Sequence, residues 1–150
     1  MGYVLAMIGL GLMMGLALTG SAVGLVVSGQ AAMGLIKKKP EAFGVGLGMA
    51  SPPATQGLYG FVAYILYSQK IAATPDFTMM NGAVVLGAGL AVGIACLVSA
   101  IYQGKVCASG LAAYASGHQV FAQTFVLAAF PEFYAILSLI TAILMMGLIK

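Results

Sequence analysis

The chain has 150 residues, of which 62% are hydrophobic and only 6% are charged. A soluble globular domain contains about 25% charged residues, so this chain cannot cover its surface with polar groups, and lipid must be its solvent. The net charge of +3 is small and scattered, which excludes a protein that binds nucleic acid. The 21 glycines also fit a membrane protein, because small residues are frequent in transmembrane helices.

Four long apolar runs, separated by three polar turns, predict four transmembrane helices. The runs cover residues 3–36, 42–67, 77–115 and 120–149. Each run is long enough to cross a hydrocarbon core of about 30 Å. A membrane β-barrel is disfavoured, because it requires short segments of alternating polarity. The predicted fold is therefore an all-α membrane protein made of two helical hairpins.

The turns predict how these helices are oriented in a cell membrane. Lys37, Lys38 and Lys39 lie in the first turn, which is therefore expected on the cytoplasmic side by the positive-inside rule. The turn at residues 116–119, which includes His118, then lies on the same side. Both termini are expected outside.

The two halves of the chain have the same organisation. Each contains a glycine-rich helix, a polar turn and a helix with a polar group near its centre, and a shift of the numbering lays Gln56 over Glu132. We therefore expect a tandem duplication, with residues 1–72 as the first hairpin and residues 73–150 as the second, together forming one membrane domain. In the first hairpin the central acid is replaced by an amide.

Glycines mark two opposite faces of the first helix. One face contains Gly9, Gly20, Gly24 and Gly34, and the other contains Gly11, Gly15 and Gly29. Small residues let helix backbones approach closely, so this helix is expected to have close neighbours on both sides. A ring of identical subunits meets that requirement, and plain packing inside one four-helix bundle is the alternative.

Glu132 is the only acidic residue inside any of the apolar runs. A carboxylate at the bilayer centre costs about 2.5–3.5 kcal/mol on insertion scales, so it must be protonated, paired or bound to a cation. No basic residue lies at the same depth, and the nearest, Lys105, lies toward the cytoplasmic end of its helix. The partner of Glu132 is therefore expected to be a proton or a metal cation.

Three further polar residues are expected at the depth of Glu132, because they lie at similar distances in sequence from the predicted cytoplasmic turns. They are Thr55, Gln56 and Gln103. Hydroxyl, amide and carboxylate oxygens suit a hard cation. A proton requires only the carboxylate, so the additional oxygens favour Na⁺.

Two other features lie beside these residues. Tyr59 is three residues after Gln56 on the same helix face, so its hydroxyl is a candidate donor to Glu132. Pro52, Pro53 and Pro131 remove backbone donors and free carbonyl groups that are able to join an ion site.

At these residues the sequence resembles the rotor-ring proteolipid of V-type rotary ATPases, and most closely the K subunit of the bacterial Na⁺-transporting type. The resemblance extends over most of the chain, with the motifs T-Q-G-L-Y-G-F-V at 55–62, Q-G-K-V at 103–106 and E-F-Y-A-I-L at 132–137. In close relatives a Leu is common at the position of Pro52, and Pro131 is a second departure. The ligands that the resemblance implies for Na⁺ are side-chain oxygens of Thr55, Gln56, Gln103 and Glu132 and the backbone carbonyl of Pro52, with Tyr59 hydrogen-bonded to Glu132.

The resemblance implies rotation-coupled transport by a homo-oligomeric ring in membrane lipid. Each Glu132 would carry one Na⁺ while other subunits hydrolyse ATP, so no catalytic residue is expected in this chain. A stator subunit must supply the Arg that displaces the ion, because this chain contains no Arg. Central-stalk subunits are further partners, and His118 with the lysine turn is either a contact for them or simply solvated.

Other functions remain open at this point. The same ring would carry H⁺ if the oxygens of Thr55, Gln56 and Gln103 are not needed. A small four-helix multidrug-type exporter would use a membrane Glu against lipophilic cations, but such a site requires a roomy aromatic cavity, and the chain has no Trp. A passive oligomeric pore is favoured only by the glycine faces.

Overall fold

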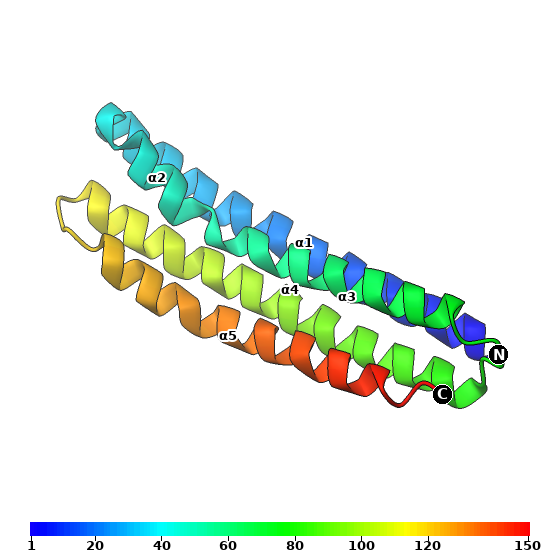
Figure 1. The fold of residues 1–150 in the computed structure, drawn as a ribbon. Helices are drawn as coiled ribbons and strands as arrows, with labels where there is room; N and C mark the ends of the chain where they lie inside the picture. The colour runs from blue at the N-terminus through cyan, green and yellow to red at the C-terminus, as the bar shows by residue number, and fades with distance from the viewer.

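The computed structural model describes residues 1–150 and contains helices and turns but no strand. The elements in order are α1 (Gly2–Lys38), η1 (Pro40–Ala42), α2 (Phe43–Ala50), η2 (Pro52–Ala54), α3 (Thr55–Ala72), α4 (Met79–Ala115) and α5 (Phe121–Met146), where η denotes a short 3₁₀ helix. The prediction of an all-helical chain is therefore confirmed. Because α2, η2 and α3 follow one another along one rod, the molecule is an elongated bundle of four rods (Figure 1).

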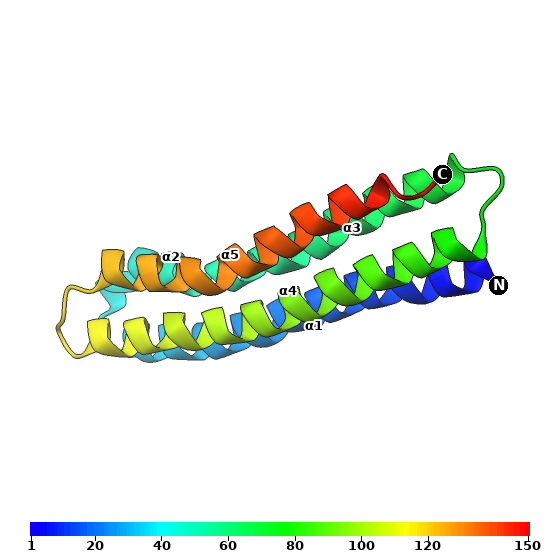
Figure 2. The same cartoon turned by 90° about the horizontal axis from the view of Figure 1, so that it is seen from below.

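The rods form two layers. Helices α1 and α4 lie side by side in one layer, and α3 and α5 lie in the other (Figures 1 and 2). Both termini and the α3–α4 connection are at one end of the bundle, whereas η1 and the α4–α5 turn are at the opposite end. Lys37, Lys38 and Lys39 therefore lie at the same end of the molecule as His118.

Three helices, α1, α4 and α5, are long and apolar enough to cross a membrane. The structure corrects the second predicted span, residues 42–67, which is not a single helix. Pro52 and Pro53 have no backbone N–H group, so the helical hydrogen bonds are interrupted and the rod is divided into α2 and α3. Pro131, in contrast, lies inside the continuous helix α5.

Hydroxyl groups replace the backbone hydrogen bonds that are lost where α2 ends. Pro52 cannot donate to the Gly48 carbonyl, and Ser51 Oγ donates to that carbonyl instead, at 3.0 Å. The Ala50 carbonyl receives a hydrogen bond of 2.7 Å from Ser28 Oγ, which belongs to α1. The end of α2 is therefore satisfied by one local hydroxyl and one hydroxyl from a neighbouring helix.

The start of α3 is held in a similar way. The first N–H groups of a helix have no partner in the helix itself. Here the Gly57 N–H donates to Ser21 Oγ of α1 at 2.7 Å. Ser21 and Ser28 therefore fix the two sides of the interruption to α1, which sets where the residues that follow it lie.

Glycines bring α1 and α4 into close contact, and we call this contact the glycine seam. A Cβ atom on Gly82, Gly89 or Gly104 would collide with the backbone of Gly2, Gly9 or Gly24, respectively. The same offset in residue number separates all three pairs, as two parallel helices in one register require. The seam therefore fixes the first hairpin against the second along the bundle axis.

The glycine faces predicted for α1 are only partly correct. Gly9, Gly20 and Gly24 do pack against α4, but Gly34 is exposed, and a Cβ atom there would meet nothing within 4 Å. Near the end of α1 the buried face includes Leu35. Gly34 is therefore displaced from it by about 100° around the helix.

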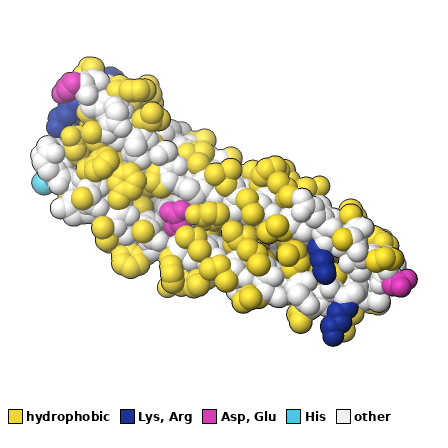
Figure 3. Space-filling view, in the orientation of Figure 1, with side chains coloured by type: hydrophobic (Ala, Val, Ile, Leu, Met, Phe, Trp, Pro, Cys, Tyr) yellow, Lys and Arg dark blue, Asp and Glu magenta, His cyan; other side chains and the backbone are white.

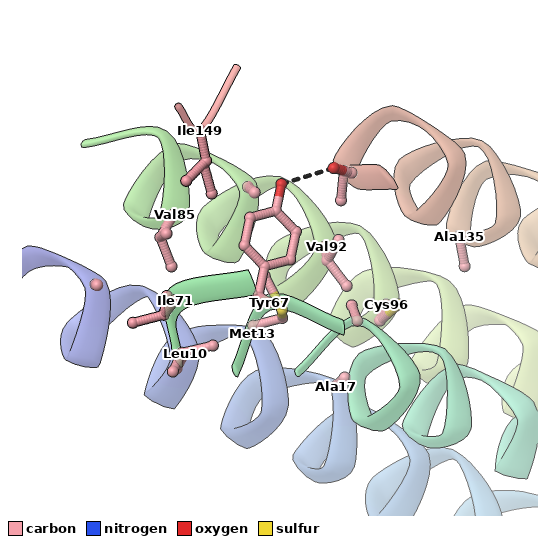
Figure 4. Packing of buried hydrophobic residues seen from close by; sticks show 14 residues of the cluster. Leu10, Met13, Ala17, Tyr67, Ile71, Val85, Val92, Cys96, Ala135 and Ile149 are labelled. Carbon is pink, nitrogen blue, oxygen red and sulfur yellow. Dashed lines mark hydrogen bonds between the residues drawn. The ribbon is translucent and has the colours of Figure 1, made fainter. Parts of the chain in front are cut away.

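The main core cluster joins both layers, with contributions from α1, α3, α4 and α5 (Figure 4). Its largest fully buried side chain, Tyr67 of α3, points toward α5 and donates from Oη to the Ala142 carbonyl at 2.6 Å. This hydrogen bond satisfies a buried hydroxyl and ties α3 to α5. The same two helices provide Tyr59 and Glu132.

Candidate ion-binding site

Glu132 is half-buried and lies midway along α5. Figure 3 shows one acidic group halfway along a surface that is otherwise mostly hydrophobic there. The other acidic residues, Glu41 and Asp76, lie in η1 and in the α3–α4 connection, at the two ends of the bundle. Glu132 is therefore the only carboxylate at mid-depth.

Each carboxylate oxygen of Glu132 accepts one hydrogen bond from a neighbouring helix. Tyr59 Oη of α3 donates to Oε1 at 2.7 Å. Gln103 Nε2 of α4 donates to Oε2 at 3.1 Å. Both donors are neutral, so they orient the carboxylate without cancelling its charge.

The amides of Gln103 and Gln56 extend this hydrogen-bonded network into the bundle. Both side chains are fully buried. Gln103 Nε2 also donates to the Ala128 carbonyl at 2.9 Å, and Gln103 Oε1 accepts from Gln56 Nε2 at 2.8 Å. The amide from the first hairpin is thus connected to the carboxylate of the second.

Thr55 and the Pro52 carbonyl lie at the interruption between α2 and α3. Thr55 Oγ1 donates to that carbonyl at 3.0 Å and lies 3.4 Å from Gln56 Oε1. Both residues border a surface hollow of about 320 Å³. The hollow is lined by Ser51, Pro52, Thr55, Gln103, Phe125, Ala128, Ala129 and Glu132. Polar side chains from three rods, with oxygen atoms from two of them, therefore border a space large enough for a cation with water.

The structure thus brings together all six residues that the sequence singled out. One detail differs from the simplest ligand set: in this arrangement Gln103 presents its amide nitrogen to Glu132, while its oxygen faces Gln56. For Gln103 Oε1 to reach a cation beside Glu132, the amide must turn by half a rotation.

Sequence reasoning did not identify Ser99. This α4 residue accepts a hydrogen bond from Gln56 Nε2 at 3.0 Å and donates one to the Pro131 carbonyl at 2.8 Å. Its position was a usable indication, because it lies four residues before Gln103 and so on the same helix face.

Lys105 and His118 do not belong to the site. Lys105 Nζ lies over the ring of Tyr102, 4.6 Å from its centroid. His118 is exposed in the α4–α5 turn. Neither residue is hydrogen-bonded to the network around Glu132.

The fold and the site define a membrane proteolipid, a small apolar helical protein with one polar site at mid-depth. The family model for the C subunit of ATP synthase matches the chain twice, over residues 8–67 and over residues 86–145. The chain therefore belongs to the family of ATP synthase C subunits. This confirms, at the level of the family, the resemblance predicted from the sequence motifs.

Individual relatives are named for both sodium and proton ATPases. The chain is 36% identical over 143 residues to A-type ATP synthase subunit K of Methanocaldococcus jannaschii, covering 95% of this chain and 62% of the relative. It is 37% identical over 126 residues to V-type sodium ATPase subunit K of Enterococcus hirae, covering 84% and 80%. It is 29% identical over 126 residues to the c' subunit of the V-type proton ATPase of Saccharomyces cerevisiae, covering 84% and 77%. The chain thus spans less than two thirds of the archaeal relative.

Proposed function

We propose that the chain is a rotor-ring subunit of a V-type or A-type rotary ATPase and that it carries Na⁺ on Glu132 during ATP-driven rotation. The observation that supports this most directly is a group of neutral oxygen atoms beside a hollow that one mid-depth carboxylate also borders. Thr55 Oγ1, Gln56 Oε1 and the Pro52 carbonyl lie together, and Thr55 and Pro52 share a hollow with Glu132. Hard cations favour such oxygen ligands.

Charge balance gives the proposed site its transport role. A carboxylate that holds one Na⁺ is neutral overall, so the loaded site crosses lipid at a lower cost than a bare anion does. Tyr59 holds the carboxylate in place while the ion enters or leaves, and Gln103 releases it when the amide turns its oxygen toward the ion. The 37% identity to a protein named for a sodium ATPase supports Na⁺ as the cargo. A ring that carries H⁺ is the second candidate, supported by the yeast relative named for a proton ATPase.

The proposed function requires that several copies of the chain assemble. Identical copies would form a ring in the cell membrane, with the lysine turn cytoplasmic and the termini outside. Gly11, Gly15 and Gly29 support this, because a Cβ atom on any of them would meet nothing within 4 Å in the single chain, which leaves this face open to a neighbour. A stator subunit would supply the Arg that releases the ion, and central-stalk subunits would bind one end of the ring.

We also propose that residues 1–72 and 73–150 are duplicated hairpins. The two separate matches of the family model support this division. Gln56 then occupies the place of a carboxylate in the first hairpin and serves as a ligand instead of a carrier.

A carboxyl-directed carbodiimide tests the identity of the ion. We expect the reagent to modify Glu132 in the purified oligomer, and Na⁺ to slow the reaction, because the bound ion keeps the carboxylate ionised and occupied. At ten times the half-protecting Na⁺ concentration, the rate should fall roughly tenfold relative to an equal concentration of a bulky organic cation. Mass spectrometry of the modified protein measures the rate. Failure of Na⁺ to protect, together with faster labelling at acid pH, would establish the proton ring instead.

Variants of the neutral ligands sharpen the same assay. Thr55→Ala or Gln103→Ala should raise the Na⁺ concentration needed for protection. Thr141→Ala is the matched control, because this exposed hydroxyl donates only within α5, to the Leu137 carbonyl. An unchanged Na⁺ dependence in the first two variants would remove those residues from the ligand set.

A further inference from the structure

Ser99 occupies a central place in the network although it does not contact Glu132. It lies in α4 and is only 6% exposed. Its hydroxyl accepts from Gln56 Nε2 of α3 at 3.0 Å and donates to the Pro131 carbonyl of α5 at 2.8 Å. One hydroxyl therefore connects the amide of the first hairpin to the backbone one residue before Glu132.

The direction of these two bonds determines how Gln56 is turned. A serine hydroxyl has a single proton to donate. Because that proton is used by the Pro131 carbonyl, Ser99 Oγ can only accept from Gln56. The nitrogen of the Gln56 amide must then face Ser99, and its oxygen must face the opposite way.

The second N–H of the Gln56 amide is also used. It donates to Gln103 Oε1 at 2.8 Å, so both donors of Gln56 are occupied inside the bundle. Gln56 Oε1 is left on the side of Thr55, whose Oγ1 lies 3.4 Å away. If Gln103 turns its own oxygen toward a cation, Ser99 remains as the acceptor that keeps Gln56 in this orientation.

We propose that Ser99 is a positioning residue for the ion site: its hydroxyl, oriented by the Pro131 carbonyl, holds Gln56 with its side-chain oxygen toward the cation. This inference rests on the proposed binding of Na⁺ beside Glu132. Ser99 itself does not coordinate the ion. Its loss would remove one of the two acceptors that orient the buried Gln56 amide and would weaken Na⁺ binding without removing a ligand atom.

The carbodiimide assay on the purified full-length oligomer tests this role, with NaCl as the only added ligand. Ser99→Ala is expected to raise the half-protecting Na⁺ concentration about 5- to 20-fold, which is the effect of losing one or two buried hydrogen bonds. The labelling rate of Glu132 without Na⁺ should stay unchanged. Ser99→Cys, which fills the space with a slightly larger group that forms only weak hydrogen bonds, should behave like Ser99→Ala. A Ser99→Cys oligomer that behaves like the parent would show that volume alone matters and would overturn the proposal.

Ser109→Ala is the matched control, because this exposed serine of the same helix donates only to the Lys105 carbonyl, at 3.0 Å. It should leave Na⁺ protection unchanged. Gln56→Ala removes the side-chain oxygen that Ser99 is proposed to position. It should therefore raise the half-protecting Na⁺ concentration at least as much as Ser99→Ala does, up to complete loss of protection. A normal half-protecting concentration in Ser99→Ala, or in Gln56→Ala, overturns the role of Ser99 while the Na⁺ site stands. Absence of Na⁺ protection in the parent oligomer overturns the proposed function itself.

Discussion

The substitution Glu132→Gln is expected to abolish the proposed Na⁺ transport by the complete ATPase while the oligomer still assembles. The amide has nearly the shape of the carboxylate and keeps an oxygen that can accept from Tyr59, so the packing of α3 against α5 is retained. It has no negative charge, so a cation loses its only anionic ligand. Na⁺ uptake into proteoliposomes, driven by ATP, measures the loss, and the size of the purified oligomer reports assembly.

Glu41→Gln provides the control for this experiment. Glu41 is an exposed acid in η1, so removal of its charge changes the net charge equally without touching the site. Transport by this variant should match that of the parent. Substantial Na⁺ uptake by the Glu132→Gln complex would show that another group carries the ion.

The substitution Gly89→Ala is expected to destabilise the bundle by about 2–3 kcal/mol, the upper range for overpacking a closely packed contact. The new Cβ atom would lie 2.7 Å from the Gly9 carbonyl carbon and 2.8 Å from its Cα. Both obstacles are backbone atoms of α1, so relief requires the two helices to separate. Unfolding by SDS in mixed micelles, followed by circular dichroism, measures the free energy of unfolding.

Gly87→Ala gives the opposite expectation in the same helix. A Cβ atom on Gly87 would meet only Met145 Cε, at 3.5 Å, which is an ordinary van der Waals distance. Alanine favours a helix over glycine by about 1 kcal/mol, so this variant should be as stable as the parent or slightly more stable. Equal stabilities for the two variants would show that the glycine seam does not control the packing of α1 on α4.

Much of this architecture could be predicted from the sequence, because lipid imposes simple requirements. Long apolar runs must be helical, and a lone mid-depth acid must have partners. Similar distances from the turns indicated that Gln56, Gln103 and Glu132 lie at one depth. In the structure, hydrogen bonds join Gln56 to Gln103 and Gln103 to Glu132.

What the sequence could not supply depends on how the helices are rotated about their axes. The spacing of Ser99 from Gln103 indicated a shared helix face, but the hydrogen-bond partners of Ser99 on α3 and α5 are set by how these helices are rotated against α4. The departure of Gly34 from the seam has a similar origin, because the contact face moves around α1 toward its end. The division of the second rod was indicated by Pro52 and Pro53, but the hydroxyls that stabilise it, Ser21 and Ser28, come from a distant segment.

The glycine seam has a consequence for ion affinity, although glycine offers no side chain to any ion. A slip of one helical turn between α1 and α4 would shift the hairpins by about 5.4 Å along the bundle axis. Gln56 would then be out of hydrogen-bonding reach of Gln103, now 2.8 Å away, and its side-chain oxygen would no longer lie at the depth of Glu132. The alignment of the two hairpins along the bundle axis depends on the backbone contact between α1 and α4. The proposed affinity for Na⁺ would therefore depend on the same contact.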